Sequence, residues 1–168
     1  MPLLYLFVTV ILLICIYTVR HYFFTLNRVL AGQRHPYIDI DTADWPAVTV
    51  LIAAHNEQAV IADILEALLA VDYPQDKLAI VPVNDRSTDN TRQIIDDYVE
   101  HYPGRITPFH RAGGKAGKAA ALKDAMAYVR TEVFLIFDAD YVPGKALIRQ
   151  LLAPFFDPEV GSVMGRVV

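Results

Sequence analysis

The first 26 residues are predominantly apolar. No charged residue occurs between Met1 and Val19, and apolar residues continue to Leu26. The large apolar side chains fall on every side of a helix drawn through this stretch, so no polar face remains for water. About 20 such residues cross the hydrocarbon core of a bilayer. The pattern predicts a transmembrane helix over residues 1–26 and a juxtamembrane linker over 27–46.

Basic residues occur only toward the C-terminal end of this segment and beyond it, at Arg20, Arg28 and Arg34. The positive-inside rule therefore predicts a protein of the plasma or inner membrane with a cytoplasmic body. A cleaved signal peptide is an alternative, because Val29-Leu30-Ala31 has the spacing of a cleavage site, although the chain lacks a basic start. A buried core helix is the other alternative, and it would need neighbours on every face.

Short apolar runs alternate with helical periodicity after residue 46. Strands are predicted at 48–53, 78–83, 106–109 and 133–137, and another is predicted to begin in 161–168. Helices are predicted after Asn56 and after Ser87 or Thr88, which we expect to cap them, then after a Gly/Lys loop at 111–117 and over 147–156. This alternation predicts an α/β fold, with a mostly parallel sheet and helices on both faces.

Polar residues follow each predicted strand, at the edge of the sheet where such folds bind ligands. They are His55-Asn56-Glu57, Asn84-Asp85-Arg86-Ser87, the loop 111–118 and Asp138-Ala139-Asp140. Asp138 and Asp140 are two residues apart, so an extended backbone points both carboxylates to one side. Paired carboxylates suit Mg²⁺ or Mn²⁺, although two acids in a solvated turn are also common.

Glycines and lysines in the loop before the third predicted body helix are suited to an anion, because flexible backbone N–H groups and lysine charge converge at a helix start. An ordinary mobile basic loop is the alternative reading. Asp85 could accept a hydrogen bond from the ring N–H of a base, or be a simple turn acid. His55 is expected to pack beside a nucleotide, and the other histidines to lie at the surface.

Composition narrows the function further. Residues 1–36 contain no acid, whereas the rest carries all 19 acidic residues against 12 basic ones, which does not favour a nucleic-acid binder. The single cysteine, Cys15, excludes a disulfide framework and a cysteine-based zinc site. No motif for nucleophilic acyl chemistry is present.

Six segments resemble, in order, family 2 glycosyltransferases of the GT-A fold. They are Val48–Glu57, Asp72-Tyr73-Pro74 (the family's DYP), Val83–Thr91 (VDDGSTDNT), Gly117–Leu122 (GKAxAL), Phe137–Asp140 (the metal motif) and Val160–Val167. Asn84 replaces the first acid of the usual pair, and His55 stands where the family often has Tyr. The membrane segment resembles that of the polysaccharide-synthase-like members.

The resemblance implies a role for each candidate residue. Ala53, His55 and Glu57 would line a nucleotide pocket, Asp85 would bind the base and Lys118 would lie near the nucleotide or the diphosphate. Asp138 would lie near the ribose or the metal, and Asp140 would be the main ligand of Mg²⁺ or Mn²⁺. The implied reaction is an inverting transfer from a nucleotide-diphosphate sugar, a UDP-sugar being favoured, to a hydroxyl of a glycan or lipid acceptor.

The resemblance also identifies residues 47–168 as the N-terminal, nucleotide-sugar-binding half of a domain that is incomplete at its C-terminus. The family's general base belongs to the second half, so we expect it beyond Val168 and expect this segment alone to be inactive. A non-catalytic nucleotide-sugar-binding membrane module and a nucleotidyltransferase-like enzyme remain alternatives.

Overall fold

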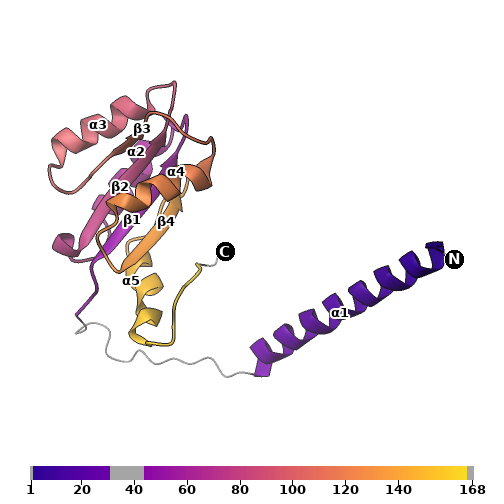
Figure 1. The fold of residues 1–168 in the computed structure, drawn as a ribbon. Coiled ribbons are helices and arrows are strands. Elements are labelled where there is room, and N and C mark those ends of the chain that lie inside the picture. Colours follow the sequence, from indigo (N-terminus) through magenta and orange to yellow (C-terminus); the bar gives the residue numbers. More distant parts are fainter. Residues whose placement is uncertain (1, 31–43, 166–168) are drawn as a thin grey trace. The chain divides into compact units, whose positions relative to one another are not determined.

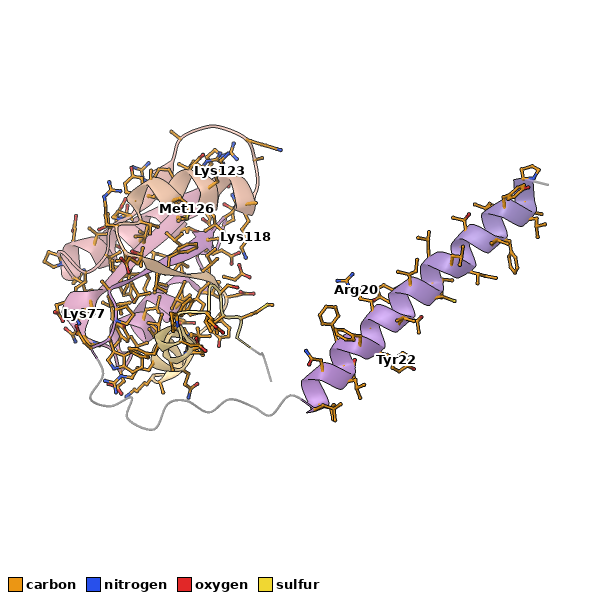
Figure 2. The ribbon with its side chains drawn as sticks, turned by 60° about the horizontal axis from the view of Figure 1, so that its bottom comes forward. Arg20, Tyr22, Lys77, Lys118, Lys123 and Met126 are labelled. Carbon is orange, nitrogen blue, oxygen red and sulfur yellow. The ribbon has the colours of Figure 1, made fainter. Side chains whose placement is uncertain are left out.

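The structure is a computed structural model that describes residues 2–30 and 44–165. The chain divides into two units, Met1–Asp39 and Ile40–Val168. In the first unit, α1 spans Pro2–Leu30, four residues past its predicted end. The segment Pro2–Asn27 is long and apolar enough to cross a membrane, with a mean hydropathy of 2.5, and its apolar stretch is not buried by the described residues. The side chains of α1 project on all sides of the helix (Figure 2).

The second unit contains a four-stranded parallel sheet in the order β3-β2-β1-β4 (Figure 1). Its strands are β1 (Val48–Ala54), β2 (Leu78–Asp85), β3 (Phe109–Arg111) and β4 (Val133–Asp138). The helices are α2 (Ile61–Leu69), α3 (Thr91–His101), α4 (Lys118–Ala125) and α5 (Leu147–Leu152), with short 3-10 turns η2 (Gln75–Lys77), η3 (Met126–Tyr128) and η4 (Ala153–Phe156). The predicted parallel α/β architecture is confirmed.

Helices cover both faces of the sheet, because β1 and β2 are apolar on both sides. α4 lies across one face, where Ala121 and Ala125 pack on Leu51, Val81 and Val83 (Figure 1). α2 lies behind the opposite face and contributes four fully buried side chains, Ile61, Ile64, Leu65 and Leu68. Small alanines on α4 let that helix approach the sheet closely.

Two predicted strands differ from the structure. Ile106 makes only an isolated bridge to Ile80, and the third strand is Phe109–Arg111 instead of 106–109. Gly161–Gly165 form no strand, so that part of the predicted strand 161–168 is wrong, and residues 166–168 lie outside the described range. β4 is consequently an edge strand in the described sheet, and its Phe134 and Ile136 are 40% and 46% exposed.

Trp45 belongs to the core of the second unit, although the sequence pattern placed it in the linker 27–46. Its ring is 4% exposed and lies against Tyr73 and Phe156, with centroid separations of 5.9 and 5.3 Å. This one large side chain extends the packed core of the unit to just before β1.

Candidate functional site

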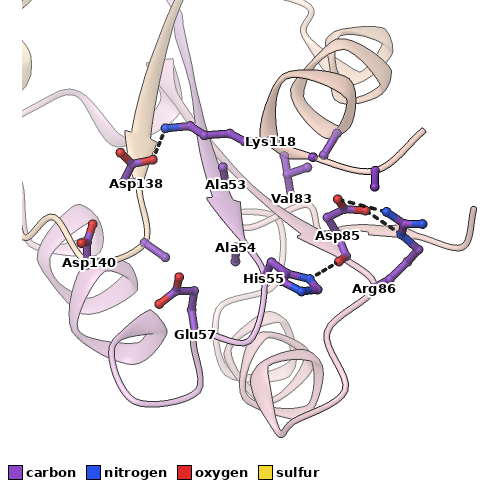
Figure 3. A pocket seen from close by; sticks show the side chains of 14 residues that line it. Ala53, Ala54, His55, Glu57, Val83, Asp85, Arg86, Lys118, Asp138 and Asp140 are labelled. Carbon is purple, nitrogen blue, oxygen red and sulfur yellow. Dashed lines mark hydrogen bonds and ion pairs between the residues drawn. The ribbon is translucent and has the colours of Figure 1, made fainter. Parts of the chain in front are cut away.

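The carboxyl ends of β1, β2 and β4 meet beside α4 and enclose a cavity of about 480 Å³. Strand register explains the meeting, since Ala53 pairs with Val83 on one side and with Asp138 on the other. The cavity brings together all seven residues singled out from the sequence: Ala53, His55, Glu57, Asp85, Lys118, Asp138 and Asp140 (Figure 3).

Side chains cross-link the loops that follow β1 and β2, which carry His55, Glu57 and Arg86 of the cavity lining. Asn56 Oδ1 accepts a 2.8 Å hydrogen bond from the Thr88 backbone, and Ser87 Oγ accepts one of 2.9 Å from the Asn56 backbone. Thr91 Oγ1 accepts a 2.8 Å hydrogen bond from the backbone N–H of Glu57.

This cross-linking corrects two expected helix caps. Asn56, Ser87 and Thr88 do not cap helices, because α2 and α3 begin after Val60 and Asn90 without a side-chain cap. Asn56 has a φ of 59°, a conformation that asparagine tolerates better than most residues. Its amide serves loop-to-loop bonding instead of helix capping.

Asp85 is the buried acid of the site, with a residue exposure of 7%. Its Oδ1 accepts hydrogen bonds from Arg86 Nε at 2.9 Å and from Arg111 Nη1 at 3.1 Å. The bond from Arg86 chiefly, and that from Arg111 in addition, hold the pKa of the Asp85 carboxyl below its ordinary value, although burial opposes the effect. Asp85 therefore stays ionised at neutral pH although little of its side chain is exposed.

Arg111 ties the Gly/Lys loop to Asp85. Its guanidinium, 4% exposed, also donates to Asp124 Oδ2 at 2.7 Å and to the Lys115 carbonyl at 2.6 Å. Gly114 has a φ of +98°, and a Cβ on it would lie 2.6 Å from Arg111 Nη2. The loop conformation thus depends both on a left-handed glycine and on the space it leaves for this guanidinium.

Charged groups of both signs lie at the other end of the cavity. Lys118 begins α4 and forms an ion pair with Asp138, the last residue of β4 (Figure 3). Asp138 and Asp140 are both exposed to the cavity side, and Glu57 is half-buried. Within residues 2–30 and 44–165 no cluster of three or more His, Cys, Asp or Glu side chains could hold a metal. Two carboxylates still fit a hard cation that takes its remaining oxygens from a diphosphate.

The two histidines near the site differ in exposure. His55 is exposed to the cavity, and its Nδ1 lies 2.7 Å from the Asp85 carbonyl oxygen. His110 is not a surface residue as expected, because its side chain is 18% exposed and lies between Asn84, at 3.2 Å, and Asp96, at 2.8 Å. His110 is therefore the hydrogen-bonding partner of Asn84, the residue that stands where the family has an acid.

Sequence reasoning missed the two arginines around Asp85. Arg86 was one of several polar residues after β2, and Arg111 was only the start of a basic loop. The available signal for Arg86 was its place in the stretch Val83–Thr91, where the resembling motif has Gly. No local pattern indicated that Arg111 would turn back to Asp85 across 26 residues.

Comparisons with known proteins show similarity over most of the second unit. The model of glycosyl transferase family 2 matches residues 49–168. A β-monoglucosyldiacylglycerol synthase of Synechocystis sp. is 35% identical over 128 residues, which are 76% of this chain and 27% of that protein. A probable glycosyltransferase, YdaM, of Bacillus subtilis is 35% identical over 151 residues, 88% of this chain and 34% of that one. The chain thus spans about a third of the length of these relatives.

Solved structures show the same fold. A mannosyltransferase from Pyrobaculum calidifontis, in complex with GDP-Man and Mn²⁺, superposes with a TM-score of 0.72 at 29% identity, covering 83% of this chain and 40% of that chain. S. aureus TarS in complex with UDP-GlcNAc has a TM-score of 0.58 at 24% identity, covering 72% and 36%, and shows the fold alone.

Proposed function

Because the chain belongs to glycosyl transferase family 2, we propose that its second unit binds a nucleotide-diphosphate sugar in the cavity beside α4. The observation that carries the proposal is the division of this one cavity into two ends. Asp85 lies at one end, and Lys118, Asp138 and Asp140 lie at the other (Figure 3). An ionised acid suits the polar edge of a base, and the mixed charges suit a diphosphate with its cation.

Six of the seven candidate residues of the cavity have a defined part in this binding. Asp85 accepts a hydrogen bond from a ring N–H of the base, and His55 and Ala53 lie beside the nucleoside. Lys118 supplies positive charge to the diphosphate, together with backbone N–H groups of the loop before α4. Asp138 and Asp140 would hold Mg²⁺ or Mn²⁺, which when bound stabilises the charge of the departing nucleoside diphosphate.

The reaction we propose is transfer of the sugar to an acceptor hydroxyl with inversion at the anomeric carbon. The C–O bond to the diphosphate breaks as the bond to the acceptor oxygen forms, and the hydroxyl proton passes to a general base. We assign no general base within the described residues. Similarity to a β-monoglucosyldiacylglycerol synthase supports a lipid as the acceptor, with a glycan as the other candidate.

The proposal includes a membrane location. A span at Pro2–Asn27, followed by basic residues, supports an anchor with the second unit on the cytoplasmic side. A lipid acceptor and a membrane-anchored transferase would then meet at the same surface.

Calorimetric titration of the whole chain in detergent tests the binding step. UDP and GDP are titrated with and without Mn²⁺, and we expect at least one nucleotide to bind about tenfold more tightly with the metal. Asp140→Ala removes this metal effect, whereas Asp97→Ala, an exposed acid on α3 outside the cavity, preserves it. Equal affinity with and without Mn²⁺ in the unmodified chain rejects the metal-dependent proposal.

A further inference from the structure

Arg86 occupies a backbone conformation that disfavours its side chain. Its φ is 57°, in the left-handed region, and the resembling family stretch has Gly at this position. Keeping a long cationic side chain at a glycine-type position places a guanidinium on the wall of the cavity, next to Asp85. A left-handed backbone at a non-glycine residue destabilises the fold, so we expect the Arg86 side chain to have a function that offsets this destabilisation.

Hydrogen-bond accounting at Asp85 shows which oxygen is available. Oδ1 already accepts two bonds, from Arg86 and Arg111, at 2.9 and 3.1 Å. Oδ2 accepts a long 3.4 Å bond from Arg86 Nη2, and a weaker contact from the backbone N–H of Gly117 also reaches the carboxylate. A carboxylate oxygen accepts about two hydrogen bonds, so Oδ2 retains acceptor capacity on the cavity wall.

Arg86 retains donor capacity at the same place. Its side chain is 36% exposed, and Nη1 reaches only the Gly114 carbonyl, at 3.5 Å. A guanidinium has five N–H donors, so some of them remain for a ligand. The cavity therefore presents an acceptor, Asp85 Oδ2, directly beside a donor, the outer edge of Arg86.

We propose that Arg86 is a specificity-determining residue that reads the base together with Asp85. It rests on the proposed function, in which Asp85 accepts a ring N–H. Arg86 then donates to the carbonyl oxygen next to that N–H. Uracil and guanine carry this pair of groups, whereas cytosine and adenine have an unprotonated ring nitrogen beside an amine. Arg111 already donates to Oδ1, so Oδ2 is the oxygen of Asp85 with acceptor capacity left for a ligand.

Thio-substituted nucleotides test the contribution of Arg86 separately from that of Asp85. Replacing a carbonyl oxygen by sulfur weakens that acceptor and leaves the ring N–H in place. The whole chain in detergent with Mn²⁺ is titrated with UDP, 4-thio-UDP and 2-thio-UDP, and with GDP and 6-thio-GDP. We expect one thio analogue of the preferred nucleotide to bind about tenfold less tightly than its parent.

The variant Arg86→Gly should bind the parent nucleotide less tightly and should lose this tenfold preference over the thio analogue. Arg86→Met removes the donors and keeps the side-chain bulk, and it should also lose the preference. It serves as a second test in case Arg86→Gly changes the conformation of the loop. Arg92→Gln changes an exposed arginine of α3 and should leave the preference intact. Thermal melting of each variant shows whether the fold is retained.

The outcomes separate this inference from the proposed function. The decisive quantity is the ratio of the affinities for the parent nucleotide and its thio analogue. If binding is tight and this ratio is the same in the unmodified chain and in both Arg86 variants, the role of Arg86 is overturned and the proposed function stands. Binding of neither UDP nor GDP by the unmodified chain overturns both.

Discussion

At the scale of single residues, Asp85 shows how the chain keeps a charge inside a small domain. A buried carboxylate is costly unless hydrogen bonds and opposite charge compensate it. Arg86 follows it directly in the chain, and Arg111 reaches it from the end of β3. Two guanidinium groups thus compensate the lost hydration of the Asp85 carboxylate, and one of them, that of Arg111, also donates to Asp124.

The lowered pKa of Asp85 makes stability depend on pH. A carboxyl whose pKa is lower in the folded state stabilises the fold above the unfolded pKa of about 3.9, and loses this contribution as pH falls through the folded pKa. Asp85→Asn should lower Tm by roughly 3–5 °C at pH 7, and the gap should shrink below about pH 4. Circular-dichroism melts of the whole chain from pH 7 to pH 3 measure it, and a constant gap would contradict the ion-pair account.

Arg111 should matter more to stability than its position in a basic loop suggests. Arg111→Gln leaves Asp85 and Asp124 without its charge and the Lys115 carbonyl without its donor. We expect Tm to fall by roughly 5 °C or more. Arg92→Gln, at a residue with a 66% exposed side chain, is the matched control and should change Tm by less than about 2 °C. Equal Tm values for the two variants would show that the buried bridge adds no stability.

At the scale of elements, the hydrophobic pattern predicted the order and type of strands and helices, because β1 and β2 are buried on both faces and their neighbours are amphipathic. It also placed most of the candidate residues after strands, which parallel topology necessarily brings to one edge, and the family resemblance added Ala53. The starts of α4 and α5 agree with the prediction. The starts of α2 and α3 were wrong, because Asn56 and Ser87 bond between loops, which depends on distant partners. The contacts of Arg111 and His110 could not be predicted either, because their partners Asp85 and Asn84 come close only when β2 and β3 pair.

The loop before α4 offers a sharp comparison between two neighbouring glycines. Gly114→Ala forces a side chain into a φ of +98° and toward Arg111, whose guanidinium is held by three partners and cannot easily move. We expect it to destabilise the fold by about 1–2 kcal/mol. A Cβ added at Gly113 would have no atom within 4 Å, so Gly113→Ala should leave the free energy of unfolding nearly unchanged. Urea unfolding of both variants measures the difference, and equal midpoints would mean that the loop rearranges without cost.

At the scale of the whole molecule, the chain combines a long apolar helix with an acidic α/β unit, and the two have different solvent requirements. Every large apolar side chain described on α1 is exposed, including Leu12, Ile16 and Phe23 at 57–65%. A helix apolar on all sides is stable in a bilayer, where its backbone groups are bonded internally, but costly in water. We therefore expect lipid to cover α1 in the working protein.

The single cysteine tests this expectation without any substitution. Cys15 lies near the middle of α1, so a membrane-impermeant charged maleimide should not label it in intact membranes, and should label it after solubilisation and denaturation. Loss of Cys15 from the mature chain would show instead that the segment is a cleaved signal peptide. For orientation, Cys15→Ala is combined with Ser162→Cys, at an exposed position of the second unit. A cytoplasmic second unit requires labelling in inverted vesicles and protection in sealed right-side-out ones, and the reverse pattern would refute the orientation derived from Arg20, Arg28 and Arg34.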